Sequence, residues 1–418
     1  MKVCAVGAAS IAFVASIAFA WSGFAPAIQA EQQPGSVARA GEPRPPDGRT
    51  IFRYDTFGDE QLWTGVLRMH EVVQTVSPAT ALAVGLKVDV EALPQAVITA
   101  LLAGEVDLTN PAVTVELLRL NAVVGVQGNV DGLGRLTSVG ITCALCHSSV
   151  DNSFAPGIGK RLDGWANIDL NVGAIVALSP ALDPATKAEF NTWGPGMYDP
   201  RHHYFDGTSI VPLSTPSLPI VIPSIYGLRG VGFETFSADG PISYWNAYVG
   251  IGQMGGQGTF HDPRVPPSGI FITQTPDLVT PKLPALLDYQ LSLRTPEPPK
   301  GSFDRDAANR GRRLFRNEAG CATCHQGPQF TDVLSGPSRN VPFLHDPAEI
   351  GMDPAYALRT ATGKYRTTPL RGLWQHPPYF HDGSAPTLLD VVNHYNDHFR
   401  LNLTEAQKAD LVEYLKSL

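Results

Sequence analysis

The pattern Cys-x-x-Cys-His occurs twice in this chain and constrains its fold more than any other feature. The first copy, CALCH, spans residues 143–147, and the second copy, CATCH, spans residues 321–325. The chain has five cysteines, and only Cys4 lies outside the two motifs. Two cysteines and a histidine this close together can face one bound group, so each motif predicts a small domain folded around a cofactor.

Several groups can bind to closely spaced cysteines. Such a pair can form a disulfide, act as a redox dithiol or supply half of a zinc site. The histidine directly after the second cysteine favours haem, because the two thiols form thioethers with the vinyl groups and the histidine binds the iron. Zinc would need further ligands at suitable spacing, and none accompanies either motif. We therefore predict two covalently bound haem c groups, attached through Cys143, Cys146, Cys321 and Cys324, with His147 and His325 as iron ligands.

The N-terminal residues predict export. Residues 1–30 have a lysine near the start, a long apolar run and small residues in AIQA, which is typical of a signal peptide removed after Ala30. The alternative is a membrane anchor, since the run approaches the roughly 20 residues of a span. No later segment has about 18 uninterrupted apolar residues, so we expect a periplasmic protein with no membrane span in the mature chain.

Composition excludes one class of partner and suggests a loop-rich fold. The formal net charge is −8 and the chain has no basic run, which argues against nucleic-acid binding. Glycine (40) and proline (36) are frequent, and only 17% of residues are charged. These values predict modest helices joined by long loops, with a large apolar cofactor supplying part of the core.

Helical patterns divide the chain into parts. A flexible leader is expected over residues 31–49. The apolar periodicity predicts helices over residues 58–76, 92–104, 110–126, 280–301, 305–325, 384–398 and 404–418. Residues 200–280 show no long period and predict mainly loops, and a proline-rich hinge near 295–301 marks a domain boundary.

We therefore expect a mainly α fold with two cytochrome c-like haem domains, long loops and a helical N-terminal extension. Residues 50–295 would contain the extension and the first haem domain, and residues 301–418 the second. A weak repeat supports two related domains. A proline-led turn with Gly-Leu and an aromatic-led turn ending in Asp-Gly follow each motif, at 223–240 and again at 368–383. Coincidence among common turn residues is the alternative.

The C-terminal part resembles a known family. Residues 302–332 and 365–395 closely resemble the C-terminal half of bacterial di-haem cytochrome c peroxidases, and within that superfamily they also resemble MauG. The resemblance is strong over 280–418, weaker over 140–280 and not visible over 50–140. It implies a mostly helical two-domain fold in which one haem transfers electrons and the other meets peroxide.

The resemblance implies further residues around the second haem. Its axial position is usually methionine in the peroxidases and tyrosine in the MauG-like branch, and here it falls on Tyr395, with His394 beside it. Tyr395 could instead be a packed helix aromatic. His381 in the turn FHDG is a candidate to line the haem, or a turn-stabilising residue.

The first domain departs from the family pattern. The family has tryptophan between the haems where this chain has Ala238, and Trp374 or Trp245 could replace it. The family's peroxide-cleaving glutamate is missing, and His261 and Asp262 are the nearest replacements. His261 has an unperturbed pKa suited to proton transfer, unless it is a surface histidine.

The sixth ligand of the first haem has several candidates. Met254 lies among glycines that would let the backbone approach a cofactor. Met69, His70 and the pair His202–His203 are the alternatives, and a methionine at helical spacing is more often a core residue.

Three functions remain open. The first is a periplasmic peroxidase-like oxidoreductase that reduces hydrogen peroxide with electrons from a small cytochrome c or copper protein, relayed between two haems. The second is a MauG-like oxidase or oxygenase that acts through high-valent iron on an organic or protein substrate. The third is a non-catalytic di-haem electron carrier. The missing glutamate counts against the first, Tyr395 favours the second, and the spare methionines permit the third.

Overall fold

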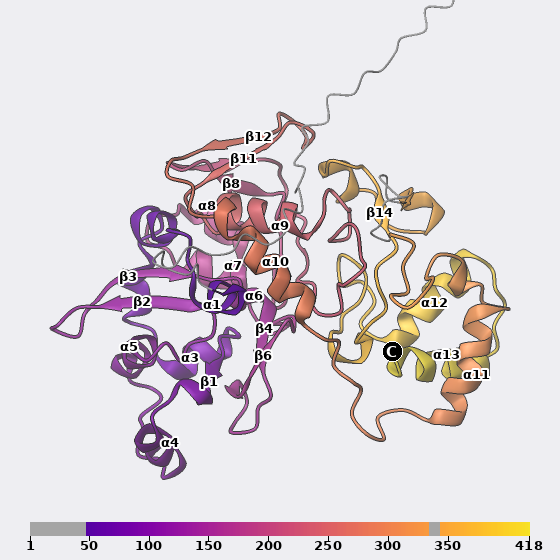
Figure 1. Cartoon of the computed structure of the whole chain (residues 1–418), viewed down its shortest axis with the longest axis horizontal. Coiled ribbons are helices and arrows are strands. Elements are labelled where there is room, and N and C mark those ends of the chain that lie inside the picture. The colour runs from indigo at the N-terminus through magenta and orange to yellow at the C-terminus, as the bar shows by residue number, and fades with distance from the viewer. Residues whose placement is uncertain (1–46, 334–342) are drawn as a thin grey trace, which may run out of the picture. The chain divides into compact units, whose positions relative to one another are not determined.

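The computed structural model describes residues 47–333 and 343–418 (Figure 1). The predicted signal peptide and most of the predicted leader lie outside these residues. The end of the leader is helical instead, because Asp47 caps α1 (Gly48–Tyr54) by accepting the backbone N–H of Thr50 at 2.9 Å. None of the helices in the described ranges has the length and apolar character that a membrane span requires.

The helices before the first motif are shorter than the sequence patterns predict. The pattern over 58–76 gives a π-helical turn, η1 (Gln61–Val66), and then α2 (Met69–Val73). Arg68 separates them because its φ of 54° is left-handed and cannot continue a helix. The pattern over 92–104 gives α4 (Gln95–Leu102), and α3 (Pro78–Ala83), capped by Ser77, was not predicted.

The predicted helix over 110–126 is wrong in its second half. The helix α5 (Pro111–Arg119) starts at the Asn110 cap, and the left-handed Asn121 (φ 54°) follows its end. Val123 then bridges to Val88, the chain turns at Val124 and Gly125, and β2 (Val126–Val130) pairs with β3 (Leu136–Ile141). The apolar character of this stretch reflects burial in the core rather than helical periodicity. This hairpin runs directly into the first motif.

Every sheet in the described part of the chain has two strands. Residues 200–280, predicted mainly as loops, contain several of these strands and two helical segments, α9 (Ile242–Tyr248) and the π-helical turn η3 (Val249–Gln253). The pairs beyond β2–β3 are β1 (Val88–Asp89) with β5 (Ile158–Gly159), β4 (Ser148–Val150) with β6 (Arg161–Asp163), β7 (Met197–Tyr198) with β10 (Ile220–Val221), β8 (His203–Phe205) with β9 (Ile210–Pro212), β11 (Thr259–Asp262) with β12 (Ile270–Thr273), and β13 (Leu344–His345) with β14 (Tyr365–Arg366).

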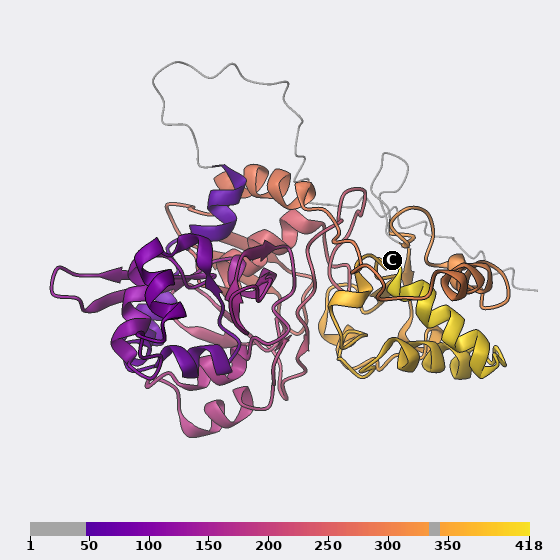
Figure 2. The ribbon, with the colours of Figure 1, turned by 90° about the horizontal axis from the view of Figure 1, so that it is seen from below.

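The remaining helices before the hinge cover the first motif and its core. They are α6 (Ala144–His147), α7 (Val172–Ala177), α8 (Pro184–Phe190) and α10 (Leu283–Ser292). The first and last helices of this part, α1 and α10, lie side by side (Figure 2). Their backbones touch, since a Cβ at Gly48 would lie 1.9 Å from the carbonyl oxygen of Ala285. Only glycine fits at this crossing.

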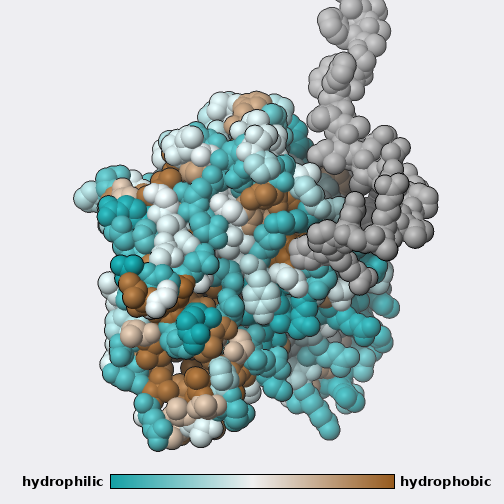
Figure 3. All heavy atoms as spheres, turned by 60° about the vertical axis from the view of Figure 1, so that its left-hand side comes forward, coloured by the Kyte–Doolittle hydropathy of each residue, from teal (hydrophilic) through white to brown (hydrophobic). Residues whose placement is uncertain are grey.

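Helix α4 is unusual because it is apolar yet has no buried residue. Val97, Ile98 and Leu101 pack only partly against the core, and Leu102 is 72% exposed. Figure 3 shows hydrophobic residues gathered over the lower part of the face that it brings forward.

Three helices form the frame of the C-terminal part: α11 (Arg305–Arg316), α12 (Leu388–His398) and α13 (Glu405–Lys416). Thr404 caps α13, and Leu411 and Leu415 form a buried apolar stripe that Leu418 continues just past the helix end. Helices α11 and α13 cross in backbone contact, because a Cβ at Gly311 would lie 2.0 Å from the Asp410 carbonyl oxygen. The helix predicted over 305–325 stops at Arg316, before the second motif.

The weak sequence repeat corresponds to a repeated loop. The turn after the first motif is closed by a bridge between Glu234 and Gly240, and the turn after the second motif by a bridge between Tyr379 and Ala385. Both bridges are antiparallel, and α9 or α12 follows.

No helix or strand lies between α10 and α11, where the sequence places its domain boundary. Residues on either side nevertheless contact each other closely. Arg359 pairs with Asp199 at 3.0 Å, and Arg366 pairs with Glu234 at 3.1 Å, both largely buried. The division at 295–301 stays a prediction.

Candidate haem sites

The first motif is held by its backbone between one segment that precedes it and one segment that follows it. Gly164 donates its N–H to the His147 carbonyl at 2.8 Å, and Asn167 donates to the Cys146 carbonyl at 2.9 Å. Gly125 has a φ of 75° and lies so close that a Cβ there would be 2.1 Å from the Leu145 nitrogen. The short helix α6 therefore has little freedom to move.

The two motif histidines share one arrangement. His147 donates from Nδ1 to the Pro223 carbonyl at 3.0 Å, and His325 donates from Nδ1 to the Phe330 carbonyl at 2.9 Å. A carbonyl only accepts, so the proton lies on Nδ1 and the Nε2 lone pair is free. Burial lowers the pKa of His147 to about 4 and also lowers the pKa of His325. A neutral imidazole oriented through Nδ1 is the usual form of a metal-binding histidine.

The motif cysteines are unpaired thiols. Burial raises the pKa of Cys143 and of Cys146 to about 12, and that of Cys321 to about 11. Zinc binding and thiol–disulfide exchange both need the thiolate, which this burial disfavours. The surroundings thus fit thioether attachment better than the two alternatives.

A cavity of about 660 Å³ lies beside the second motif, lined by His325, Ala322 and Pro328 together with Phe315, Phe330 and Tyr414. Its volume and its aromatic walls suit a large planar group. Trp374 offers a further sign of a missing partner. Its buried Nε1–H donates to no group among the described residues, so an acceptor on a bound cofactor would satisfy it. The residues present therefore fit haem.

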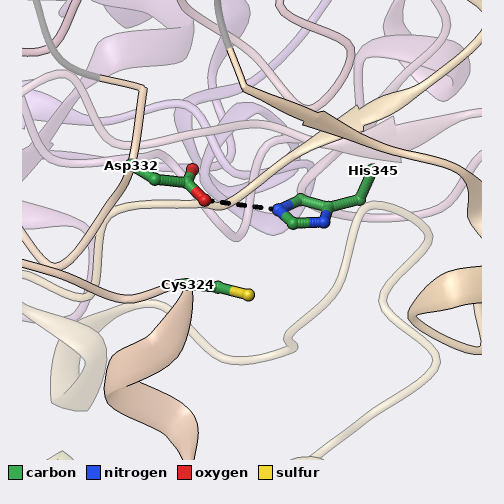
Figure 4. Close-up of side chains that lie close together, drawn as sticks. All are labelled: Cys324, Asp332 and His345. Carbon is green, nitrogen blue, oxygen red and sulfur yellow. Dashed lines mark hydrogen bonds and ion pairs between the residues drawn. The ribbon is translucent and has the colours of Figure 1, made fainter.

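Cys324, Asp332 and His345 converge beside the second motif (Figure 4), with their ligand atoms within 4.8 Å of one another. His345 bonds Asp332 through Nε2 at 3.4 Å and Glu349 through Nδ1 at 2.9 Å. Hydrogen bonds, chiefly to Asp332, raise the pKa of His345 to about 11, so its imidazole is a cation at neutral pH. Sequence reasoning missed His345, because it lies on the two-residue strand β13 with no spacing relation to the motif.

Tyr395 lies near both cysteines of the second motif. Burial raises the pKa of its phenol first, and the nearby Cys321 and Cys324 raise it further. His394 is engaged elsewhere, since its Nε2 bonds the Ile350 carbonyl at 3.0 Å. The structure thus brings Tyr395, rather than His394, toward the second motif, and its role as an iron ligand stays a prediction.

Met254 lies near the first motif. It is 4% exposed and packs in the same apolar cluster as Ala144 and Cys143. Trp63 donates its Nε1–H to the Met254 carbonyl at 2.9 Å, which fixes the backbone at this point. The alternative Met69 is also buried, in the neighbouring cluster that contains Leu145.

Tyr198 is a further residue near the first motif that sequence reasoning missed. Burial raises the pKa of its phenol, and nearby Cys146 contributes to the increase. Its hydroxyl donates to the Gln253 side chain, and Gln253 donates to the His203 carbonyl at 2.9 Å. His203 is stacked on Trp193, which explains the buried position of the His202–His203 pair.

His261 is not brought to either motif. It is exposed on the β11–β12 hairpin, and its Nε2 lies 2.9 Å from the Thr273 hydroxyl. The structure therefore favours the surface histidine that was the alternative to a proton-transfer group. The adjacent Asp262 is buried and pairs with Arg264 at 2.7 Å.

His381 is buried in a ring cluster. Its Nε2 lies 3.0 Å from the Tyr365 hydroxyl, and its backbone carbonyl accepts the Val221 N–H at 2.8 Å. Burial lowers its pKa, so the ring is neutral. These contacts fit the turn-stabilising role better than a role at the iron.

The two candidate bridging tryptophans differ in their contacts. Trp374 packs edge to face against Trp165, with ring centroids 5.6 Å apart. Trp245 donates to the Glu234 carbonyl at 3.0 Å and lies against the buried Arg201, inside the core. Trp374 thus contacts a residue next to the first motif, and Trp165 is a partner that no sequence pattern marked.

Comparisons with known proteins agree with the motifs. Residues 363–399 match a family model described as RoxA-like, cytochrome c-like. The chain is 32% identical over 143 residues to the cytochrome-c peroxidase IdrP2 of Pseudomonas sp. (strain SCT), covering 27% of this chain and 39% of that protein. It is 30% identical over 162 residues to the methylamine utilization protein MauG of Methylorubrum extorquens, covering 32% of this chain and 42% of that protein.

A third relative is the hydrazine synthase subunit gamma of Kuenenia stuttgartiensis, 30% identical over 184 residues, with 35% of this chain and 52% of that protein covered. The chain thus matches about half or less of each of these relatives. Taken together with the two motifs, the similarities support the superfamily of bacterial di-haem cytochrome c peroxidases and MauG for this chain.

Proposed function

We propose that this chain is a periplasmic di-haem c-type oxidoreductase that reduces hydrogen peroxide, with electrons relayed between two covalently attached haems. The contact between Trp165 and Trp374 carries the proposal, because it joins a residue beside the first motif to the segment that follows the second. The haems would supply one-electron redox chemistry, and each catalytic turnover would need two electrons and two protons for one peroxide.

The side chains near the two motifs would have different roles in this function. His147 and His325 would bind through Nε2 while their Nδ1–H groups keep the rings oriented. The buried surroundings of both motifs would exclude water from most of each bound group. The His345 cation would lie next to the attachment point at Cys324 and favour electron gain there. The electron donor would be a small periplasmic cytochrome c or copper protein.

The proton donor for peroxide cleavage is not His261 in this proposal, because that side chain is exposed on a hairpin. The Tyr198 hydroxyl, hydrogen-bonded to Gln253 and close to Cys146, is the better placed protic group. Its high pKa means that it would donate a hydrogen bond as a neutral phenol.

A second candidate function is an oxidase or oxygenase acting on an organic or protein substrate, as in the MauG-like branch. The position of Tyr395 beside Cys321 and Cys324 favours it. The third candidate, a non-catalytic electron carrier, would require two protein ligands on each iron. Buried Met254, in the same apolar cluster as Ala144, would be the second ligand at the first motif.

The test is an anaerobic titration of the reduced protein with peroxide, followed by the haem absorption bands. We expect two electrons to leave the haems for each peroxide consumed. A variant with Cys321→Ala and Cys324→Ala, which cannot attach the second haem, should lose the relay. Reduced bands that persist in excess peroxide would support the carrier, and peroxide-driven oxidation of an added substrate would support the second candidate.

A further inference from the structure

We infer that the N-terminal extension encloses a binding cavity for a small apolar gas molecule behind the first haem motif. The inference does not depend on the proposed peroxidase activity. The extension is the part of the chain in which the sequence shows no resemblance to the di-haem peroxidases. It supplies most of the residues that line the cavity.

The cavity has a volume of about 70 Å³ and is surrounded by α2, α3, α5 and the β2–β3 hairpin. Its wall includes Trp63, Met69, Ala81, Leu117, Val139 and Leu145. Leu145 lies between the two cysteines of the first motif. The cavity therefore reaches the attachment helix α6 from the side of the extension.

The few polar groups in the wall all have partners. Thr114 donates its hydroxyl to the Val76 carbonyl at 2.6 Å, and Trp63 donates to the Met254 carbonyl at 2.9 Å. Lys87 pairs with Asp169. A buried water needs about two to four polar partners, and these residues leave none for it. The cavity should therefore exclude water and accept an apolar molecule.

Its size selects among apolar molecules. A cavity that holds one water needs roughly 10–15 Å³, and an apolar cavity of about 150 Å³ binds benzene. At about 70 Å³ the space suits a molecule of very few heavy atoms and excludes an aromatic ring. Xenon and dioxygen are of this class.

Two wall residues connect the cavity to the first motif. Leu145 belongs to the motif, and Trp63 holds the backbone of Met254, which packs with Ala144 and Cys143. A molecule bound in the cavity would contact both Leu145 and Trp63.

The test is a crystal structure of the haem-loaded protein under xenon pressure, with two variants on helix α3. Ala81→Leu places a larger side chain in the cavity, whereas Ala83→Leu changes an exposed residue of the same helix. We expect xenon density in the wild type and in Ala83→Leu and none in Ala81→Leu. Ordered water in the wild-type cavity, or the absence of xenon from it, would overturn the inference.

A variant with an enlarged cavity provides a second test if Ala81→Leu does not fold. Leu117→Ala removes wall atoms, so we expect higher xenon occupancy and, in addition, binding of benzene, which the wild type should refuse. Unchanged xenon occupancy in Leu117→Ala would overturn the inference. Both readouts are independent of peroxide turnover, so a failed peroxidase assay leaves them interpretable.

Discussion

Trp165 and Trp374 meet edge to face, with ring centroids 5.6 Å apart and ring planes inclined by 84°. Trp165 directly follows Gly164, whose N–H holds the His147 carbonyl at 2.8 Å. Trp374 lies in the segment between the second motif and α12. The contact therefore connects the surroundings of the two motifs through two aromatic rings.

The first prediction concerns this contact. Trp374→Leu should slow electron exchange between the two haems, because it removes one ring of the pair. The edge-to-face contact contributes only about 0.5–1.5 kcal/mol to stability, so the variant should remain folded. The measurement is rapid half-reduction of the protein, followed by the redistribution of the two haem absorption bands.

Trp374→Phe is the matched control and should retain much of the wild-type rate, since it keeps an aromatic ring. Trp245→Leu tests the other candidate, which packs against Arg201 in the core. If redistribution is equally fast in Trp374→Leu and in the wild type, electrons do not pass through this pair.

The C-terminal helices could be predicted from the sequence because each carries its own signals. Thr404 caps α13, and a leucine stripe on that helix faces the core, so local pattern and tertiary packing agree. The motif residues could be singled out from their spacing, which favours haem over zinc or a disulfide, and their individual roles stay a prediction.

Other parts depended on contacts that no local pattern encodes. Trp165 lies far along the chain from Trp374, and neither Trp165 nor His345 has a characteristic spacing to a motif. The stretch after Asn121 is apolar enough to suggest a helix. The left-handed φ of Asn121, 54°, ends the helix there, and the chain continues into β2. Backbone geometry at a single residue decided the outcome there.

The second prediction concerns His345. Replacing it with glutamine removes a buried positive charge beside Cys324, so the midpoint potential of the second haem should fall. Hydrogen bonds, chiefly to Asp332, raise the pKa of His345, so the charge should be present at neutral pH and the difference between variant and wild type should appear there. Spectroelectrochemical titration of both proteins measures it.

His398→Gln is a suitable control, because this exposed histidine hydrogen-bonds the Glu349 carbonyl at 2.9 Å and packs against the rings of His394 and Phe399. It should leave both midpoint potentials unchanged. A His345→Gln protein with an unaltered second potential would mean that the cation is screened from the haem and acts only in packing.

The third prediction concerns pH and His376. Burial lowers the pKa of His376 from 6.5 to about 4. Between pH 6.5 and pH 4 this histidine is protonated in the unfolded chain but not in the folded chain. The free energy of unfolding is therefore unaffected by His376 above pH 6.5 and decreases as the pH falls below it. His376→Gln should weaken the acid destabilisation by about 1–2 kcal/mol, measured as the change in unfolding free energy between about pH 7 and pH 4.5. An unchanged pH dependence in the variant would contradict the prediction.

The last prediction concerns Tyr395, whose phenol lies near Cys321 and Cys324 on the buried side of α12. If the phenol oxygen binds or contacts the iron of the second haem, Tyr395→Phe removes a group that stabilises ferric iron, and the midpoint potential should rise. Tyr395→Met should raise it further, because methionine is the commoner axial ligand of high-potential c-type haems. The ferric absorption spectrum should change in both variants.

His394→Gln separates this effect from a general disturbance of the helix. His394 is the next residue on α12, but its ring bonds the Ile350 carbonyl at 3.0 Å and lies away from the motif. Its replacement should leave the spectrum and both potentials unaltered. If Tyr395→Phe behaves in the same way as His394→Gln, then Tyr395 is a packing residue against Phe380, at a ring separation of 5.8 Å, and the oxidase proposal loses the observation that favours it.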